Sequence, residues 1–386
     1  MLYLSGQVAA NGAAQINQSG NSLRLCFNSA ANTTAMRMAV YNGINCFRTD
    51  LHINSAYESG YITNTSDIGA QWLGILDYAT VNSTNWTLSD WNASVSEAVA
   101  QYPQIREWEI WNEPEYFGSS YQDWNSTHYF YMIRSASMII KSRYPNDTVV
   151  CFGGATTHPL FGSNSVAYEY PFYEQAWKLG ASKYCDAISL HAYDDYQQYN
   201  LSKLGYNGNG LTMGGEWNYT IGLYENLTHK PIWITETGLE SPNSYTDSNE
   251  QTLYMNQTLR VLSASPFVKR VYWFQLASYP NFPWGLIQLP YFGFQQMEIK
   301  PAWNIYVNFS KNEGRKPSLT TAPTTSMPEG KTVNSTIAST TAPAAVNQGP
   351  EPQNANNKGE VLAALVIIVI LAAYFYSKRR KTAQQT

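Results

Sequence analysis

The sequence has few charged residues and no surplus of basic ones. Asp, Glu, Lys and Arg make up only 13% of the chain, and the formal net charge at pH 7 is −4. Proteins that bind nucleic acid usually carry a basic stripe or patch that neutralises phosphates. The composition therefore argues against a nucleic-acid partner. The 44% of hydrophobic and 14% of aromatic residues fit a globular body with a sizeable core.

Cysteine is also scarce. The chain has four cysteines, and none of them forms a close Cys-x-x-Cys pair: Cys26, Cys46, Cys151 and Cys185. This spacing excludes a disulfide-dense scaffold and a cysteine zinc site. Because all four lie in or beside strand-like runs, we expect buried free thiols. Bridges between Cys26 and Cys46 or between Cys151 and Cys185 are the alternative for a chain outside the cell.

The N-terminal segment, residues 1–20, lacks the pattern of a secretory signal. MLYLSGQVAANG has no basic region followed by a long apolar stretch. Asn-x-Ser/Thr sequons nevertheless recur from Asn17 to Asn334, which indicates a glycoprotein that faces the outside of the cell. Two explanations for this mismatch stay open: the true start lies upstream, or the signal has already been removed.

A long apolar run near the C-terminal end predicts a membrane anchor. Residues 361–376, VLAALVIIVILAAYFY, are uncharged and would span roughly 24 Å as a helix. The basic residues in 377–386 favour the cytoplasmic side, which would leave the body extracellular. A sorting signal cleaved after export and a buried core helix are the alternatives. Residues 313–360, rich in Thr, Ser and Pro, are expected to form an extended stalk, so the body comprises residues 21–312.

Short apolar runs recur through the body. There are eight of them, in chain order LRLCFN, INCFRTDL, WLGILDYA, REWEIWN, TVVCFGG, DAISLHAY, PIWITETG and RVYWFQLA. Segments with apolar residues at three- and four-residue spacing lie between them, including 128–144, 170–180 and 249–265. Strands alternating with helices predict an α/β fold, and eight such units predict a closed (β/α)8 TIM barrel. A doubly wound open sheet is the competitor, but no glycine-rich phosphate fingerprint follows the first strand.

Polar residues close several of these strands. In such a barrel the active site lies at the C-terminal ends of the strands, and Glu113 and Glu236 close the fourth and the seventh. Two carboxyl groups about 5 to 5.5 Å apart can cleave a glycosidic bond with retention, without a metal or cofactor. The nucleophile must be ionised and the acid protonated, so their pKa values have to differ. Arg48 and the hydroxyl of Tyr193 are suitable donors for keeping Glu236 charged.

The motifs around these two residues resemble a known group of enzymes. WNEP and ITETG resemble the acid/base and nucleophile motifs of clan A glycoside hydrolases, and the resemblance covers residues 22–309. GINCFRTDL, ISLHAY and YWFQ are similar to the second, sixth and eighth strands of that clan. WGLI and EIKPAWNIY are similar to the closing loop and final helix of its families 5 and 39. The resemblance implies that Glu113 is the acid/base, Glu236 the nucleophile, Asn112 a ligand of the sugar 2-hydroxyl, and Trp273 a stacking platform.

Further candidate substrate-binding residues are Arg48, His191, Tyr193 and Trp284. Structural explanations also exist: a turn carboxylate for Glu113, an ion pair for Arg48, a buried histidine for His191, and core packing for Trp273. The two glutamates at matching strand ends favour catalysis.

The sequence therefore predicts a membrane-tethered, extracellular retaining β-glycosidase or endoglycanase that acts on a β-linked oligo- or polysaccharide. A transglycosylase that remodels surface glycans and a non-catalytic carbohydrate-binding protein are the alternatives. The low charge and the many Asn, Thr and Tyr resemble archaeal surface proteins from hot acidic settings, which implies an acidic pH optimum.

Overall fold

The computed structural model describes residues 23–28, 32–81, 86–115, 125–156, 166–193, 213–241, 249–278, 283–289 and 297–312. Eight parallel strands pair in chain order, and β1 also pairs with β8, so the sheet closes into a barrel. The strands are β1 Arg24–Asn28, β2 Cys46–Asp50, β3 Gln71–Leu76, β4 Glu107–Ile110, β5 Thr148–Thr156, β6 Ala187–His191, β7 Ile232–Thr237 and β8 Val268–Trp273. The predicted barrel is confirmed, and the open doubly wound sheet is wrong.

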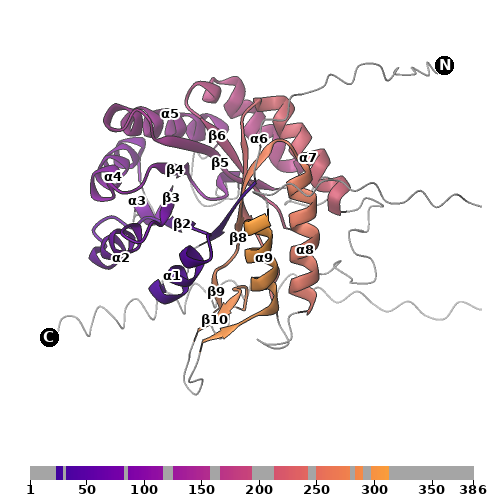
Figure 1. Ribbon diagram of the computed structural model, residues 1–386. Coiled ribbons are helices and arrows are strands. Elements are labelled where there is room, and N and C mark those ends of the chain that lie inside the picture. Colours follow the sequence, from indigo (N-terminus) through magenta and orange to yellow (C-terminus); the bar gives the residue numbers. More distant parts are fainter. Residues whose placement is uncertain are drawn as a thin grey trace, which may run out of the picture. The chain divides into compact units, whose positions relative to one another are not determined.

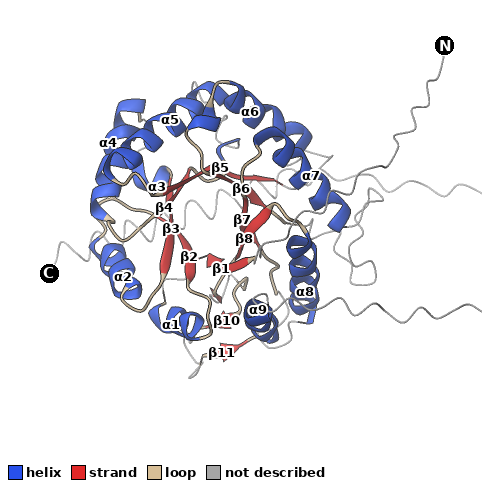
Figure 2. Cartoon of the chain, turned by 45° about the horizontal axis from the view of Figure 1, so that its top comes forward, coloured by secondary structure: helices blue, strands red, loops and turns tan. Residues whose placement is uncertain are grey.

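Helices alternate with the strands and form a ring outside them (Figures 1 and 2). They are α1 Thr33–Tyr41, α2 Ala56–Ser66, α3 Tyr78–Val81, α4 Leu88–Gln101, α5 Ser126–Arg143, α6 Val166–Lys178, α7 Met213–Thr228, α8 Asn249–Ala264 and α9 Pro301–Asn312, with a short 3-10 helix at Ala181–Lys183. The helices expected from the apolar spacing are confirmed as α5, α6 and α8. A small sheet also forms, in the order β11 Glu298–Ile299, β10 Ile287–Gln288 and β9 Ala277–Ser278.

Helix α5 shows how local sequence sets an element. The side chain of Asn125 caps its N-terminus by accepting hydrogen bonds from the backbone N–H groups of Thr127 and His128. Its buried residues recur at three- and four-residue spacing, including Tyr129, Met132, Ile133, Ala136 and Ile140. This spacing makes one apolar stripe, which packs against the barrel, while Lys141 and Arg143 close the last turn where cations are favoured.

The strands separate two apolar layers. Successive strand residues point to opposite faces, so alternate positions fill the barrel and the others face the helices. A small cluster comprises Cys26, Cys46, Leu73, Val150, Ala187, Trp233 and Tyr272, one residue from each of seven strands. Their neighbours Phe27, Phe47, Ile234, Val271 and Trp273 belong instead to the large core shared with the helices. The small cluster therefore fills the barrel interior.

All four cysteines form disulfides. Cys26 of β1 is bridged to Cys46 of β2, and Cys151 of β5 is bridged to Cys185, which lies two residues before β6. The expectation of buried free thiols is wrong, and the alternative pairing is correct. For the first bridge the reason is register: in parallel neighbouring strands, Phe27 pairs with Phe47, which sets the two preceding cysteines side by side inside the barrel.

Among the described residues, none of the helices is long and apolar enough to cross a membrane. The N-terminal segment 1–20, the stalk 313–360, the apolar run 361–376 and the basic tail 377–386 all lie outside the described residues.

Candidate active site

Arg48 is the centre of the hydrogen-bond network at the barrel mouth. It projects from β2 and is almost fully buried, with 2% of its side chain exposed. Its Nε donates to Glu109 at 2.5 Å and its Nη1 to Glu236 at 2.6 Å. Nη1 also donates to Asn28 at 3.1 Å, and Nη2 donates to Asn112 at 2.7 Å. One guanidinium thus joins residues of β1, β4 and β7 and the segment after β4.

Glu236 reaches this network because β7 is irregular. Trp233 lies in the barrel interior and Ile234 faces the helices, so strict alternation would turn Glu236 outward. The register between β7 and β8 shifts between Ile234 and Thr237, and that between β6 and β7 shifts beside His191. Such irregularities redirect a side chain. Glu236 consequently lines the cavity at the mouth, with 13% of its side chain exposed.

Glu113 is placed by unusual backbone angles after β4. Trp111 has φ of 70° and Glu113 has φ of 48°, a left-handed region that non-glycine residues seldom occupy. The backbone N–H of Glu113 donates to the carbonyl of Gly153 in β5 at 2.7 Å, which holds the turn. The ring of Trp111 packs against Trp86 and Trp91, on the side of the helices. Glu113, with 37% of its side chain exposed, lines the cavity.

His191 lies between the two glutamates. Its Nδ1 is 2.9 Å from Oε1 of Glu113, and its Nε2 is 3.7 Å from Oε1 of Glu236. One ligand-type atom from each of the three residues lies within 4.8 Å of the others. The predicted pairing of Glu113 and Glu236 across the mouth is therefore found, with an imidazole between them.

The electrostatic surroundings favour an ionised Glu236. Burial raises the pKa of this carboxyl group, but the charges of His191 and Arg48 and hydrogen bonds from Tyr193 and Arg48 outweigh it and hold the pKa below its ordinary value. The Tyr193 hydroxyl donates to Oε2 of Glu236 at 2.8 Å. Burial lowers the pKa of His191, whereas Glu236 and Glu113 raise it, and the net direction is upward. The two donors expected from the sequence, Arg48 and Tyr193, both contact Glu236.

A cavity of about 360 Å³ opens at this end of the barrel. Its lining residues are Asn28, Arg48, Thr49, Asp50, Ile75, Tyr78, Asn112, Glu113, Glu236, Phe274 and Gln275. The walls are mostly polar and include the aromatic residues Tyr78 and Phe274, which suits a polyhydroxylated ligand with apolar ring faces. Asn112 lines this cavity, and its contact with the sugar 2-hydroxyl stays a prediction.

The expectation that Trp273 stacks on a sugar is wrong. Trp273 has no exposed surface, and its ring packs against Tyr254 of α8 and Tyr306 of α9, each with centroids 6.2 Å away. Its neighbour Phe274 lines the cavity instead. Since alternate strand residues face opposite sides, an assignment that is wrong by one position exchanges core and cavity.

Trp284 lies beside the site. Its ring meets Tyr193 edge-on, with centroids 5.9 Å apart, and Phe274, with centroids 5.7 Å apart. It is not among the residues that line the cavity, and its part in substrate binding stays a prediction.

Glu109, Asn28 and Asp50 complete the site, and sequence reasoning assigned them no role in it. Glu109 lies inside the fourth strand rather than at its end, where the polar residues of an active site are expected. Asn28 ends the first strand, where its amide donates to the carbonyl of Thr235 at 2.8 Å. Asp50 lines the cavity two residues after Arg48. Its signal in the sequence is its spacing from Arg48: alternate residues of a strand point to the same side, so Asp50 is expected on the same side of β2 as Arg48.

Glu113, His191 and Glu236 also form a group that could offer ligands to a metal ion. The guanidinium of Arg48, 2.6 Å from Glu236, opposes a further positive charge at that carboxylate. The donor set therefore fits proton transfer and nucleophilic attack better than cation binding.

Comparisons with known proteins agree with this geometry. Residues 161–282 match the family model described as glycosyl hydrolase catalytic core. No curated protein gives a significant match. Among solved structures, a β-glucosidase from Exiguobacterium marinum is 13% identical with a TM-score of 0.52, covering 74% of this chain and 87% of its own. A Thermotoga maritima β-glucosidase in complex with castanospermine is 12% identical with a TM-score of 0.54, covering 74% and 86%.

A family 1 β-glucosidase from Thermotoga maritima is 11% identical with a TM-score of 0.52, covering 73% of this chain and 86% of its own. At these identities the structural matches establish the barrel fold. The family match and the paired carboxyl groups support an enzyme of the glycoside hydrolase class.

Proposed function

We propose that the chain hydrolyses O-glycosidic bonds of a β-glycan or β-glycoside with retention, by a double displacement that uses two glutamates. The observation that carries this proposal is the pair formed by Glu113 and Glu236, with carboxyl oxygens in a group spanning no more than 4.8 Å. This separation fits direct attack by one carboxylate better than the 6.5 to 9.5 Å that leaves room for a water molecule in inverting enzymes.

Each glutamate has a role that follows from its surroundings. Glu236, contacted by Arg48 and Tyr193, attacks the anomeric carbon, and the bond to the leaving oxygen breaks as the covalent glycosyl-enzyme forms. Glu113, the more exposed of the two, donates its proton to the leaving oxygen and then takes a proton from the water that releases the sugar. Asn112, held by Arg48, lies where its amide can donate to a sugar hydroxyl.

The proposed location is the cell surface, with a single membrane pass at residues 361–376 and the catalytic body outside. Two disulfides support an oxidising compartment, and the sequons along the body support exposure to glycosylation.

The test is sugar release by the full chain from β-glucans, β-mannans, xylans and aryl β-glycosides across pH 2 to 7. We expect activity on at least one substrate at acidic pH, and we expect Glu236→Gln to abolish it. Glu113→Gln should cost about 10²- to 10⁴-fold in kcat, and less on substrates whose leaving group needs little protonation.

The first product anomer, followed by proton NMR, decides the stereochemistry. A β-anomer is expected from a β-glycoside. An α-anomer, or full activity of Glu236→Gln, would refute the proposed mechanism. Added acceptor sugars show whether transfer competes with hydrolysis.

A further inference from the structure

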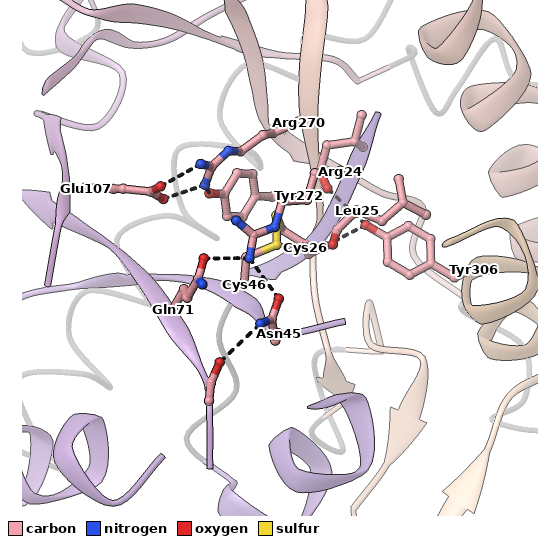
Figure 3. The surroundings of a disulfide bond; sticks show 12 residues. Arg24, Leu25, Cys26, Asn45, Cys46, Gln71, Glu107, Arg270, Tyr272 and Tyr306 are labelled. Atoms are coloured by element: carbon pink, nitrogen blue, oxygen red, sulfur yellow. Dashed lines mark hydrogen bonds and ion pairs between the residues drawn. A yellow bond between two sulfur atoms is a disulfide. The ribbon is translucent and has the colours of Figure 1, made fainter. Parts of the chain in front are cut away.

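Two glutamates of β4 face the barrel interior, and each holds an arginine from another strand. Glu107 pairs with Arg270 of β8 through two hydrogen bonds of 2.5 Å. This pair lies beside the Cys26–Cys46 disulfide (Figure 3), and neither of its residues lines the cavity. Two residues along, Glu109 pairs with Arg48. The strand thus carries two Glu–Arg pairs, one whose residues do not line the cavity and one whose arginine contacts Glu236.

Glu109 is fully buried, and its contacts are directed to Arg48. Its Oε2 accepts from Nε of Arg48 at 2.5 Å. Its Oε1 has no hydrogen-bond partner among the described residues. A buried carboxylate is costly unless it is paired, so the position of Glu109 depends on this arginine.

Through Arg48, Glu109 is connected to the proposed nucleophile. The guanidinium is planar and rigid, so fixing Nε at Glu109 also fixes the direction of Nη1, which lies 2.6 Å from Glu236. The same bond places Nη2 at 2.7 Å from Asn112. A negative charge at Glu109 also offsets part of the positive charge that Arg48 presents to Glu236.

We propose that Glu109 is a positioning residue, which fixes both the direction and the net charge that Arg48 presents to Glu236. This inference rests on the proposed function, because it assigns Glu109 a part in preparing the nucleophile. Glu109 itself does not line the cavity and does not contact substrate.

The charge of Glu109 should affect the ionisation of Glu236 in a predictable direction. The groups that face Glu236 are Arg48, Asp50, Glu113, His191 and Tyr193. Glu109→Gln retains an oxygen that can accept from Nε of Arg48 but removes the negative charge. Arg48 is then less compensated, the ionised form of Glu236 is favoured further, and Glu236 should lose its proton at lower pH.

The experiment compares pH profiles of kcat/KM for the full chain, using an aryl β-glycoside that the unmodified protein cleaves. Glu109→Gln should move the acid limb down by about one pH unit, with kcat reduced and KM unchanged. Glu107→Gln is the matched control, since it removes the same charge from the same strand at the Arg270 pair. It should lower the melting temperature without moving the acid limb. Tyr193→Phe removes a hydrogen-bond donor to Glu236 and should move the acid limb to higher pH.

An acid limb that is the same in Glu109→Gln, Glu107→Gln and the unmodified protein would overturn the inference while leaving the proposed function in place. If the unmodified protein cleaves no glycoside, the proposed function fails instead. The ionisation of Glu236, followed by carbon-13 NMR of glutamate carboxyl groups and assigned with Glu236→Gln, then decides the inference alone. A titration midpoint of Glu236 that is lowered by Glu109→Gln and not by Glu107→Gln supports the inference. An unchanged midpoint in Glu109→Gln refutes it.

Discussion

Trp273 and Phe274 are neighbours in the chain, but their rings lie in different surroundings. Trp273 is enclosed between β8 and the helices α8 and α9, and Phe274 lines the cavity. A ring enclosed on all sides stabilises the fold, whereas a ring at the cavity wall can meet a ligand. The two residues therefore offer a matched pair for separating folding from binding.

We expect Trp273→Ala to lower the free energy of unfolding by about 3 to 5 kcal/mol, because it leaves a large cavity in a packed layer. Phe274→Ala should leave stability nearly unchanged and raise KM for the glycoside. Denaturant unfolding and steady-state kinetics measure the two effects. The reverse pattern, with KM raised by Trp273→Ala alone, would contradict the assignment of Phe274 to the cavity.

At this scale the sequence predicts residues that end strands and misses those within them. Glu113 and Glu236 are recognisable because they form a pair at matching strand ends, which a structural role for either carboxylate alone does not explain. Glu109 is not recognisable, since a strand such as EWEI carries polar residues at alternate positions for many reasons. The Cys26–Cys46 disulfide depends on which cysteines share a face of neighbouring strands, and this requires the register.

Strand β5 supports the site through glycines at its C-terminal end. Gly154 has φ of 100°, and a Cβ atom there would lie 2.2 Å from Nε2 of His191. Gly153 has φ of 62°, and a Cβ atom there would lie 2.5 Å from the carbonyl oxygen of Trp111. At both positions a side chain would collide with these neighbouring atoms, so both require glycine. The element thus leaves space for the imidazole and for the turn that carries Glu113.

Gly154→Ala should displace His191 and reduce kcat at least tenfold, since the imidazole is buried and has little freedom to move. Gly222→Ala in α7 is the control, because a Cβ atom there has no neighbour within 4 Å. It should retain full activity and gain up to about 1 kcal/mol of stability. Equal kcat values for the two variants would contradict the role assigned to Gly154.

Most elements could be predicted because strands and helices have different apolar periods. All eight apolar runs become strands, and the expected helices form. The shifts that redirect Glu236 and the left-handed angles at Trp111 and Glu113 could not be predicted in this way. They break the local period and depend on contacts with neighbouring strands.

Over the whole molecule, buried carboxyl groups set the dependence of stability on pH. Burial, and then the charge of Asp50, raises the pKa of Asp77 well above its ordinary value. Burial also raises the pKa of Asp50, and burial and then the charge of Glu169 raise that of Glu115. The folded state therefore binds protons more tightly at these sites than the unfolded chain does.

A carboxyl group whose pKa is raised by folding contributes stability below its unfolded pKa and loses it as pH rises through the folded value. We therefore expect the melting temperature to fall as pH rises from about 4 to 7, the window above the ordinary carboxyl pKa values. Calorimetry over this range measures the effect. The lowered pKa of Glu236 acts in the opposite sense and should moderate it.

Asp77→Asn tests the cause. The amide oxygen can still accept from the backbone N–H of Ala79, which donates to Asp77 at 2.8 Å, and no proton has to be held. The slope of melting temperature against pH should become shallower. A melting temperature that rises toward neutral pH in the unmodified protein would refute the prediction.

The closure of the barrel has a consequence for biosynthesis. The hydroxyl of Tyr306 in α9 lies 2.5 Å from the carbonyl oxygen of Cys26 in β1 (Figure 3). It also lies 3.1 Å from the carbonyl oxygen of Val271 in β8, on the other side of the seam. The residues it joins are separated by most of the chain. A ribosome must therefore release the sequence through β8 before β1 and β8 can pair, and through α9 before Tyr306 can join them, so the ring closes late in synthesis.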